Sequence, residues 1–392
     1  MNKPADRCPG VFRTHPAADG HLARIRLSGG RIEPAALEAL ASAADELGDG
    51  HVEITVRANL QVRGIGADDV AAFADRIVDA GLVAGRAHDR VRNIVVSPLS
   101  GRIGGRADLW PAVADLEDRL ARHDWTGELS GRFWFGFDDG RGDVAARDVD
   151  VLAVAVGPQE AELVIAGRPT GRVVSLAELP AAMLTVAEAF HRRRDDQWRI
   201  RELSEPERAA VRETVAGRGR AGTAPRPDVL SEPAGPTVGW FTQSDGRVLL
   251  GAVTEFGRLT ARQAQFAAAV GSPVLFTPQR EILLPDLSEG VAETVVRVLA
   301  PLGFSFDANS PWTRFSACSG APGCAKSHAD VREDLLVHLG SLDASAPGER
   351  EHWVGCDRGC GAPSGAHVRK VAVPGGDYRT DRSGDPAPGT GA

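Results

Sequence analysis

The chain has 392 residues, which is enough for two or three domains with a sizeable core. Its hydrophobic content of 43% and charged content of 25% are those of an ordinary globular protein, and its net charge of −8 argues against a general nucleic-acid or anionic-membrane binder. The first residues show no apolar leader, and the longest apolar run (residues 151–156) is too short to cross a bilayer. We therefore expect a cytoplasmic protein with reduced thiols and neither a membrane nor a nucleic-acid partner.

Two segments of the chain share one pattern of predicted elements. The first begins at Gly20 and the second at Gly246, and each indicates a strand, a Gly-Arg turn, an amphipathic helix and a second strand. The apolar residues at helical spacing are Leu37, Leu40, Ala44 and Leu47 in the first segment and Ala264, Ala267 and Ala268 in the second. Such a duplication predicts a pseudo-symmetric protein with a site between its halves.

Composition divides the rest of the chain. Residues 214–236 are rich in glycine and proline and are predicted to be a linker, and the tail at 374–392 is predicted to be disordered. Four further segments follow from this division: 1–85 with the first repeat, 86–213 with strands and helices, 237–305 with the second repeat, and 306–373 with four of the five cysteines.

The end of the first repeat, EITVRANLQVRGI at 53–65, is predicted to be one strand with a polar face. Side chains alternate along a strand, so the following residues share a face: Thr55, Arg57, Asn59, Gln61 and Arg63. The guanidinium fork of arginine binds carboxylates in bidentate fashion, and this face has no acidic residue after Glu53, so it favours an anionic ligand. An ordinary solvent-facing strand is the alternative.

The equivalent strand of the second repeat keeps Thr277 and Gln279 but continues with Leu283 and Pro285. We therefore expect the first half to hold the ligand. Further candidates are Arg92 and Asn93, which precede an apolar strand, and Arg132, which begins the aromatic run GRFWFGF. The aromatic residues of that run either belong to the core or line a flat apolar ligand.

The cysteines form two short loops, with Cys318 and Cys324 in one and Cys356 and Cys360 in the other. Structural zinc favours thiolates two to four residues apart within each pair, and five residues separate the first pair here. The cysteines of a [4Fe–4S] cluster bind different irons, so wider loops suit a cluster better. Zinc and unrelated thiols are the alternatives, and Cys8 stands apart.

These motifs together resemble those of the sirohaem-containing sulfite and nitrite reductases. The resemblance rests on the C-x₅-C and C-x₃-C pairs, on TVRANLQVRGI and RNIVVSPLSG, and on the duplication. It implies an α+β fold with two pseudo-repeated ferredoxin-like half-domains and αβ cluster-binding domains. It also implies that Arg57 and Arg92 approach substrate or tetrapyrrole carboxylates, and that Cys360 bridges the cluster and a sirohaem iron.

One feature departs from the reductases, which carry a Lys-x-Lys pair where this chain has Arg132 and Trp134. The opening RCPGVFRTHPAADGHLARIRL is most similar to that of the precorrin-3B synthases, a related family of aerobic cobalamin biosynthesis. This likeness implies a monooxygenase that hydroxylates precorrin-3A at C-20 with formation of a γ-lactone. It implies a [4Fe–4S] cluster, a mononuclear non-haem iron, O₂ and reduced nicotinamide, and an arginine-lined pocket that holds a substrate instead of a cofactor.

Three functions stay open from the sequence: this oxygenase, a sirohaem-dependent sulfite or nitrite reductase, and a non-catalytic cluster protein that transfers electrons or binds a tetrapyrrole. The ligands of the mononuclear iron are not evident, although His328 and Asp330 have the spacing of two ligands of a facial triad. No G-x-G-x-x-G motif indicates a nicotinamide site, so the electrons are expected to come from a ferredoxin or a reductase.

Overall fold

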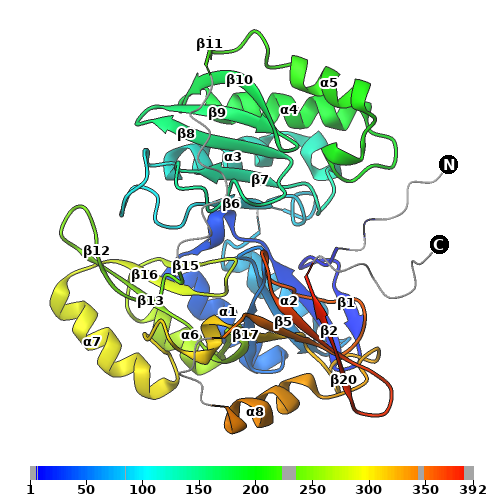
Figure 1. The fold of residues 1–392 in the computed structure, drawn as a ribbon, viewed down its shortest axis with the longest axis vertical. Helices are drawn as coiled ribbons and strands as arrows, with labels where there is room; N and C mark the ends of the chain where they lie inside the picture. The colour runs from blue at the N-terminus through cyan, green and yellow to red at the C-terminus, as the bar shows by residue number, and fades with distance from the viewer. Residues whose placement is uncertain (1–5, 7, 84, 223–234, 343–347, 384–392) are drawn as a thin grey trace.

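The computed structural model describes residues 6, 8–83, 85–222, 235–342 and 348–383. It contains four β-sheets, of which two belong to the repeated segments and two to the regions that follow each repeat. Figure 1 shows the sheet of residues 94–221 above the other three. No helix in the described part of the chain is long and apolar enough to span a membrane.

The two repeats have the same order of elements, so the predicted duplication is confirmed. The first consists of β1 (His15–Ala17), β2 (Gly20–Ile25), η1 (Ser28–Gly30), β3 (Arg31–Ile32), α1 (Pro34–Leu47), β4 (His51–Ile54), β5 (Leu60–Ile65) and α2 (Val70–Asp79). The second consists of β12 (Gly239–Thr242), β13 (Val248–Ala252), η4 (Glu255–Gly257), β14 (Arg258–Thr260), α6 (Ala261–Ala268), β15 (Val274–Phe276), β16 (Ile282–Leu287) and α7 (Glu289–Leu299).

The two helices that follow the Gly-Arg turns form from clear local signals. Pro34 occupies the first turn of α1, where its missing N–H is not needed, and the predicted apolar face is buried. Helix α6 begins with a capping box, in which Thr260 accepts a hydrogen bond from the Gln263 amide. The two helices pack against each other, and their buried faces belong to a single core that spans both half-domains.

The two half-domain sheets exchange one strand. The first sheet has the order β1-β2-β5-β4-β14, and the second has the order β12-β13-β16-β15-β3. Strand β14 of the second repeat therefore closes the first sheet, with Arg258 opposite Glu53, while β3 of the first repeat closes the second sheet, with Ile32 opposite Val274. Neither sheet is complete without the other half of the chain.

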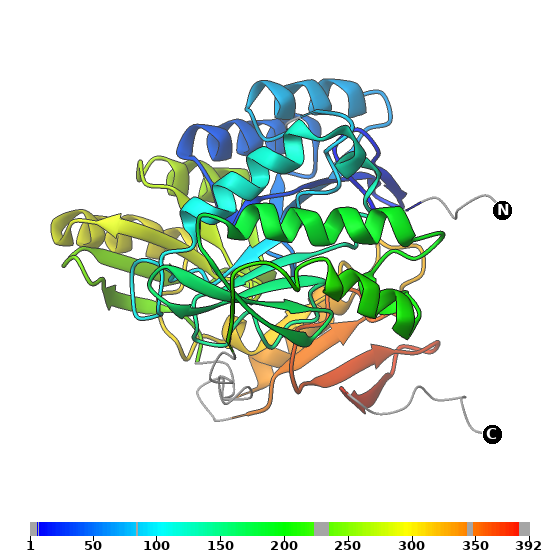
Figure 2. The same ribbon diagram turned by 90° about the horizontal axis from the view of Figure 1, so that it is seen from above.

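The region after the first repeat forms a six-stranded sheet with helices. Its elements are β6 (Ile94–Val96), α3 (Trp110–Arg122), η2 (Asp124–Glu128), β7 (Phe135–Asp138), β8 (Val151–Gly157), β9 (Glu160–Ile165), β10 (Arg168–Ser175), α4 (Leu179–Arg193), η3 (Ile200–Glu202), α5 (Glu205–Glu213) and β11 (Arg220–Ala221). Figure 2 shows this domain from above, with α4 crossing in front of its sheet. Strands β6, β7 and β8 are parallel, and β9 is antiparallel to β8.

The cysteine-containing module after the second repeat has a smaller sheet with the same opening topology. Its elements are η5 (Ala300–Leu302), η6 (Pro311–Thr313), β17 (Phe315–Ala317), α8 (Val331–Ser341), β18 (Glu351–Val354), β19 (Val368–Ala372) and β20 (Tyr378–Arg382). Strands β17, β18 and β19 are parallel, and β20 is antiparallel to β19. The pseudo-symmetry therefore extends beyond the half-domains to the domains that follow them.

Two boundaries predicted from composition are wrong. The expected linker begins too early, because Arg220 and Ala221 form β11 at the edge of the sheet and pair with β10. The expected disordered tail also begins too early, because β20 makes a full ladder with β19 and the Tyr378 hydroxyl donates to Asp334. Residues 223–234 of the linker and 384–392 of the tail lie outside the described residues.

Candidate functional site

The predicted strand at 53–65 is wrong, because these residues form a hairpin. Strand β4 ends at Ile54, β5 begins at Leu60, and Ala58 at the tip has a positive φ of 57°. The Thr55 hydroxyl accepts hydrogen bonds from the Arg57 and Asn59 amides and holds the turn. The predicted alternation survives in β5, where Leu60 and Val62 are in the core while Gln61 and Arg63 belong to the opposite face.

Arg57 lies at the hairpin tip and is half-buried. It faces the upper domain, which is the sheet of residues 94–221 with its helices (Figure 1). Its guanidinium lies 4.9 Å from the centre of the Trp134 ring and donates to the Gly131 carbonyl at 3.1 Å. Burial lowers the pKa of Arg57 to about 10, and Arg199 and Arg24 add like charge. No described carboxylate forms an ion pair with it, so Arg57 can bind an anion.

Two arginines extend this positive region, Arg24 on β2 and Arg26 directly after it. Arg24 is half-buried, donates to the Gln61 side chain at 3.0 Å, and has a buried Nε–H without a partner. Burial lowers its pKa, while Cys8, Cys360 and Glu53 lie close enough to oppose this effect. Arg26 is almost fully buried and donates to neutral oxygens, among them Asn93 Oδ1 at 3.1 Å.

Glu53 joins three parts of the chain behind this region. It accepts from Gln61 at 2.7 Å, lies 3.0 Å from Arg258 of β14 and lies 2.7 Å from Arg332 of α8. Burial alone would raise the pKa of Glu53, but Arg332, Arg258 and the hydrogen bonds outweigh it and lower the pKa to about 2. Glu53 is therefore a buried carboxylate that ties both half-domains to the cysteine module.

Arg63 connects the same sheet to a cysteine loop. Its guanidinium binds Asp19 through two hydrogen bonds of 2.8 and 2.9 Å and donates to the Gly323 carbonyl at 2.7 Å. Gly323 directly precedes Cys324. The structure thus gives Arg63 a bridging contact between the first half-domain and the loop of the first cysteine pair.

Three other predicted ligand-binding residues are committed to contacts within the protein. The Arg92 guanidinium pairs with Glu117 at 2.5 Å and donates to the carbonyls of Arg26 and Leu82. Asn93 accepts from Arg26 and donates to the Gly131 carbonyl at 3.0 Å, and Asn59 accepts from the Leu27 amide at 3.0 Å. Asn93 and Asn59 thus support the Arg57 hairpin, while Arg92 closes the domain boundary.

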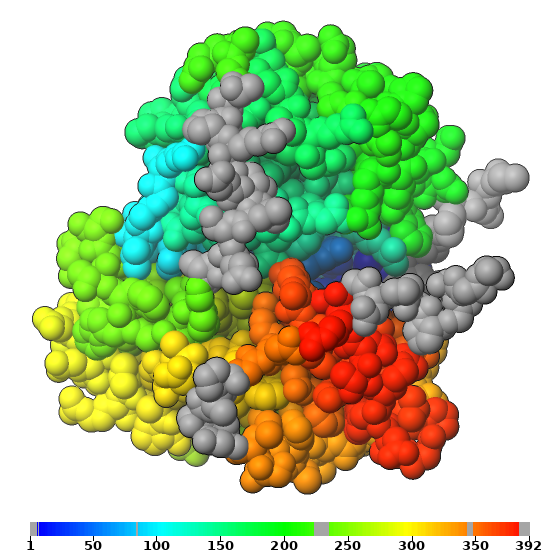
Figure 3. Space-filling model, in the orientation of Figure 1, coloured from blue at the N-terminus to red at the C-terminus, as the bar shows by residue number. Residues whose placement is uncertain are grey.

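The aromatic run divides between the core and the site. Phe133, Phe135 and Phe137 are buried in the core of the upper domain, as the simpler interpretation expects. Trp134 points the other way, toward Arg57, and its buried indole N–H has no partner. Arg132 is exposed and lies over the Trp198 ring at 4.1 Å. Figure 3 shows a recess between the upper domain and the red C-terminal sheet, with blue N-terminal residues at its floor.

The four clustered cysteines lie on two loops at the carboxyl ends of neighbouring parallel strands. Cys318 follows β17 directly, and Cys356 follows β18 after Gly355. The Cys318 sulfur accepts a hydrogen bond from the Gly355 amide at 3.3 Å. Burial raises the pKa of the Cys318 thiol, and Cys360 and Cys324 also raise it, so these two groups lie nearby.

The loops need small residues at defined places. A Cβ on Gly355 would come within 1.7 Å of the Ser327 hydroxyl, so only glycine fits there. Gly320 has a φ of 67° and sits against Val331. These glycines bring backbone amides toward the sulfurs, and such amides stabilise the negative charge of a thiolate-bound cluster.

A single zinc ion would need the thiolates close together. Thiolates around one zinc lie about 3.8 Å apart, given Zn–S bonds of about 2.3 Å in a tetrahedron. Among the described residues, the only group of three or more potential ligands within 4.8 Å of one another is Asp138, Asp139 and Asp143, so no three of the cysteine sulfurs lie that close together.

His352 fixes the loop of the second cysteine pair. This histidine is fully buried, and burial together with the nearby Arg280 lowers its pKa to about 3, so the ring is neutral. Its Nε2 lies 3.0 Å from the Cys360 carbonyl, which can only accept, so Nε2 carries the proton. The Nδ1 atom then accepts from the Ser316 hydroxyl at 2.9 Å.

The structure does not assemble a mononuclear iron site around the suggested residues. His328 is exposed, and the Asp330 carboxylate accepts from the Glu333 amide at the start of α8. The carboxylate group at Asp138, Asp139 and Asp143 is also occupied, because Asp138 accepts four backbone amides and Asp139 pairs with Arg141. The residues at these two places do not fit a non-haem iron.

Sequence reasoning missed Arg24 and Arg26, although a signal was present. The opening of the first repeat reads HLARIRL, in which both arginines alternate with core residues along β2 and the residue after it, as Gln61 and Arg63 do on β5. Since β2 pairs with β5, Arg24 lies opposite Gln61. Applying the test of alternation to both strands would have found the positive region.

Comparison with known proteins identifies the class. Residues 15–80 match the family described as nitrite/sulfite reductase ferredoxin-like half domain. The fold matches that of NirA from Mycobacterium tuberculosis with a TM-score of 0.73 at 21% identity, over 92% of this chain and 73% of NirA. The chain thus has the nitrite/sulfite reductase fold, and its first repeat matches the half-domain of that family.

Three curated proteins match the chain at the same sequence identity. The chain is 26% identical to precorrin-3B synthase from Sinorhizobium, over 94% of this chain and 81% of that protein. It is also 26% identical to ferredoxin–nitrite reductase from Synechococcus elongatus, over 92% and 79% of the two chains. A ferredoxin-dependent sulfite reductase from Mycobacterium tuberculosis matches at 26% identity over 79% of this chain and 61% of its own length. These relatives are enzymes, and their equal identity leaves the reaction to be argued from the site.

Proposed function

We propose that this protein is an oxygenase of the precorrin-3B synthase type, which hydroxylates precorrin-3A at C-20 with formation of a γ-lactone. In this reaction one atom of O₂ enters the tetrapyrrole and the other leaves as water, with two electrons from a reduced nicotinamide delivered directly or through a ferredoxin or reductase. The proposal joins the likeness to precorrin-3B synthase to the arrangement of charges around Arg57.

The observation that carries the proposal is a set of arginines without counter-charges. Among the described residues, Arg24, Arg26 and Arg57 have no carboxylate within ion-pair distance, and burial lowers the pKa of all three. A buried positive charge without a partner is costly, so this region favours a ligand that brings its own carboxylates. Precorrin-3A is such a ligand, since it carries acetate and propionate groups around a large ring.

Trp134 favours a large substrate over a small oxyanion. The resemblance to the reductases implies a second basic residue at this position, as a cage of dense positive charge for sulfite requires. Here the Trp134 ring supports the Arg57 guanidinium and presents a buried indole N–H. An aromatic surface beside an arginine suits the edge and carboxylates of a planar tetrapyrrole, whereas a cage for sulfite requires dense positive charge.

The residues of this chain would act by binding and positioning. Arg57 and Arg24 would hold carboxylates at the rim of the ring, and Gln61 and Asn93 would keep these arginines in place. Binding energy from such remote groups orients the reacting carbon. Cys318, Cys324, Cys356 and Cys360 would hold a [4Fe–4S] cluster, which supplies single electrons when bound.

The second candidate is a sirohaem-dependent nitrite or sulfite reductase. The same arginines would then bind the carboxylates of sirohaem, and the Arg24 guanidinium lies within electrostatic range of Cys360. The chain is as similar in sequence to ferredoxin–nitrite reductase as to precorrin-3B synthase, and this supports the second candidate. The exchange of a basic residue for Trp134 argues against it.

The visible spectrum of protein purified without oxygen separates the two candidates. The proposed oxygenase shows a broad iron–sulfur shoulder and no tetrapyrrole bands, whereas stoichiometric sirohaem bands would overturn the proposal. The second step is incubation with precorrin-3A, a reductant and O₂, followed by mass spectrometry. The product should gain one oxygen, with label from ¹⁸O₂, and no gain with the cluster intact would indicate a non-catalytic role.

A further inference from the structure

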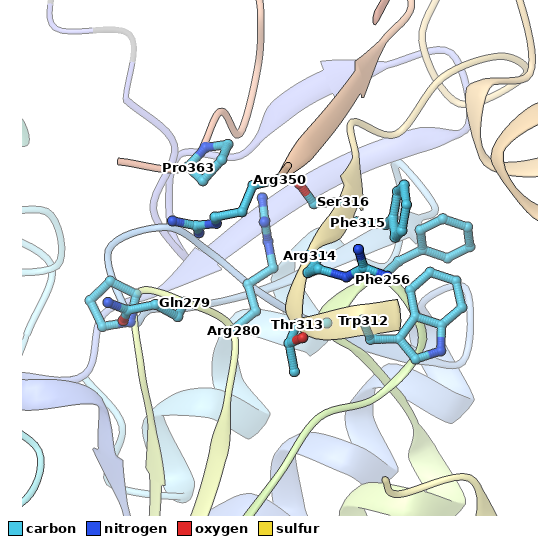
Figure 4. A pocket seen from close by; sticks show the side chains of 12 residues that line it. Phe256, Gln279, Arg280, Trp312, Thr313, Arg314, Phe315, Ser316, Arg350 and Pro363 are labelled. Atoms are coloured by element: carbon cyan, nitrogen blue, oxygen red, sulfur yellow. The ribbon is translucent and has the colours of Figure 1, made fainter. Parts of the chain in front are cut away.

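A small pocket lies beside the hairpin tip of the second half-domain and is lined by residues of this hairpin and of the cysteine module. Figure 4 shows Arg280, Arg314 and Arg350 converging on this pocket, with Phe256 and Trp312 along one side. Gln279 and Arg280 come from the hairpin between β15 and β16, while Arg314 and Arg350 come from the beginnings of β17 and β18.

The pocket is the pseudo-symmetric counterpart of the Arg57 site. The second hairpin repeats the first, because the Thr277 hydroxyl accepts from the amides of Gln279 and Glu281, as Thr55 does in the first half. Arg280 has a positive φ of 64° at the position equivalent to Ala58. Both hairpin tips therefore carry an arginine, but Arg280 lies one position further along its hairpin than Arg57 does.

The adjoining strands extend the correspondence. Phe315 pairs with Glu351 at the start of β17 and β18, as Ile94 pairs with Phe135 at the start of β6 and β7. The residues just before these pairs correspond, so Arg314 occupies the place of Asn93 and Arg350 that of Trp134. Where the first site has one arginine on an aromatic ring, the second has three arginines.

Two of these arginines lack counter-charges among the described residues. Arg280 is half-buried and donates to the Gly361 carbonyl at 2.6 Å, and Arg350 donates to the Ser364 carbonyl at 3.2 Å. Neither has a carboxylate within ion-pair distance. The nearby Glu281 is buried and accepts hydrogen bonds from the Thr277 hydroxyl and the Thr237 amide, and it forms no ion pair with either arginine.

The apolar side of the pocket comes from Phe256 and Trp312. Their rings are tilted against each other with centres 4.9 Å apart. The Arg332 guanidinium, which pairs with Glu53, lies 5.7 Å from the centre of the Phe256 ring. A ligand in this pocket would therefore meet guanidinium groups on one side and aromatic edges on the other. This combination suits a small organic anion.

We propose that this pocket is a second anion-binding site, which takes a small molecule that bears carboxylate or phosphate groups. The site is separate from the Arg57 site, because its residues lie on the second half-domain and on the strand starts of the cysteine module. Gly361 directly follows Cys360, so a bound anion lies next to the loop of the fourth cysteine.

The test is calorimetric titration of the oxygen-free purified holoprotein with two probes, citrate for carboxylates and pyrophosphate for phosphates. Binding of either probe, weakened by salt and weakened at least about tenfold in R350Q and in R280Q, supports the site, since losing a charge-assisted hydrogen bond costs this much. The probe that binds more tightly names the chemical class. R350K should retain most of the affinity.

The matched control is R297Q, on the exposed face of α7. It removes one positive charge and should leave probe affinity unchanged. The proposal is overturned if neither probe binds the holoprotein, or if R297Q weakens binding as much as R350Q does. Iron content and circular dichroism of each variant establish that it is folded, and R350Q and R280Q provide two independent variants.

Discussion

Arg57 illustrates how a residue can be placed for binding by contacts that do not neutralise it. Its guanidinium rests on Trp134 and a carbonyl oxygen, so its orientation is fixed while its charge stays uncompensated. The predicted polar stripe includes this residue, although the predicted strand is a hairpin. The correction matters, because the tip position brings Arg57 to the upper domain.

We predict that Arg57→Gln weakens tetrapyrrole binding at least about tenfold, since it removes a charge-assisted contact to a carboxylate. The cluster should be retained, because no cysteine contacts Arg57 among its hydrogen-bonded partners. Fluorescence quenching by the tetrapyrrole and the iron content of the protein measure the two effects. Arg247→Gln, at an exposed pair with Asp245, is the matched control; unchanged binding in R57Q would refute the role.

Glu53 has a structural role that the sequence pattern did not reveal. We predict that Glu53→Gln lowers the free energy of unfolding by about 3 kcal/mol at neutral pH, from a pKa lowered from 4.5 to about 2. A carboxyl with a lowered pKa stabilises the fold fully above its unfolded value and loses this effect as the pH falls. The difference between the two proteins should therefore shrink from about pH 4.5 to pH 2.

Urea unfolding at several pH values checks this expectation. The control is Glu33→Gln, which removes an exposed ion pair with Arg31 and should change stability by less than about 1 kcal/mol. Equal effects of the two substitutions, or a difference that does not depend on pH, would count against the buried junction.

At the scale of elements, the two cysteine loops depend on parallel strands that end side by side. Because β17 and β18 are parallel neighbours, Cys318 and Cys356 leave the sheet at the same edge. We predict that Cys318→Ser abolishes the iron–sulfur absorbance and most of the bound iron and sulfide. Cys8→Ser should leave all three unchanged, and a loss of iron in the Cys8 variant would show that the ligand set is wrong.

Strand β20 gives a second prediction at this scale. Deletion of residues 374–392 removes β20 and the Tyr378 ring, which lies 4.7 Å from Trp353, and should cost at least about 3 kcal/mol of stability. Deletion of residues 384–392 should have little effect, since it spares the ladder. Thermal unfolding compares the two proteins, and equal stability would contradict a structural role for β20.

The elements show where sequence reasoning succeeds and where it fails. Helical spacing located α1 and α6, and alternation located the faces of Gln61 and Arg63, because both signals are local. The hairpin at 55–59 was missed because its left-handed residue is Ala58, not the glycine or asparagine that announces a turn. Strand β20 was missed because a polar, glycine-flanked segment pairs only through tertiary context.

The candidate site was predictable to a similar extent. Cysteine spacing and the arginine at position 57 could be identified from residue chemistry alone. That Arg92 pairs with Glu117 could not, because the partner lies 25 positions away and depends on the docking of α3. The second pocket could not be foreseen either, since the sequence of the second repeat has lost most of the polar stripe and its arginines come from three separate segments.

At the scale of the whole molecule, the exchange of β3 and β14 makes the halves interdependent. We predict that fragments 1–222 and 235–392 expressed alone aggregate or are unfolded, because each leaves a sheet edge and a shared core exposed. Coexpressed, they should copurify as a one-to-one complex, measured by light scattering. A fragment that is monomeric, with a cooperative unfolding transition, would refute this interdependence.

The exchanged strands also have an evolutionary meaning. A symmetric dimer in which each subunit lends one strand to its partner would have the same sheet orders, with two identical sites related by the twofold axis. In this chain the equivalent positions have separated: one hairpin presents Arg57 to an aromatic ring, the other presents Arg280 to a basic pocket, and only the second αβ module carries the paired thiols. Fusion of such a dimer into one chain allows each half to acquire its own function. The exchanged strands β3 and β14 then hold the two halves together.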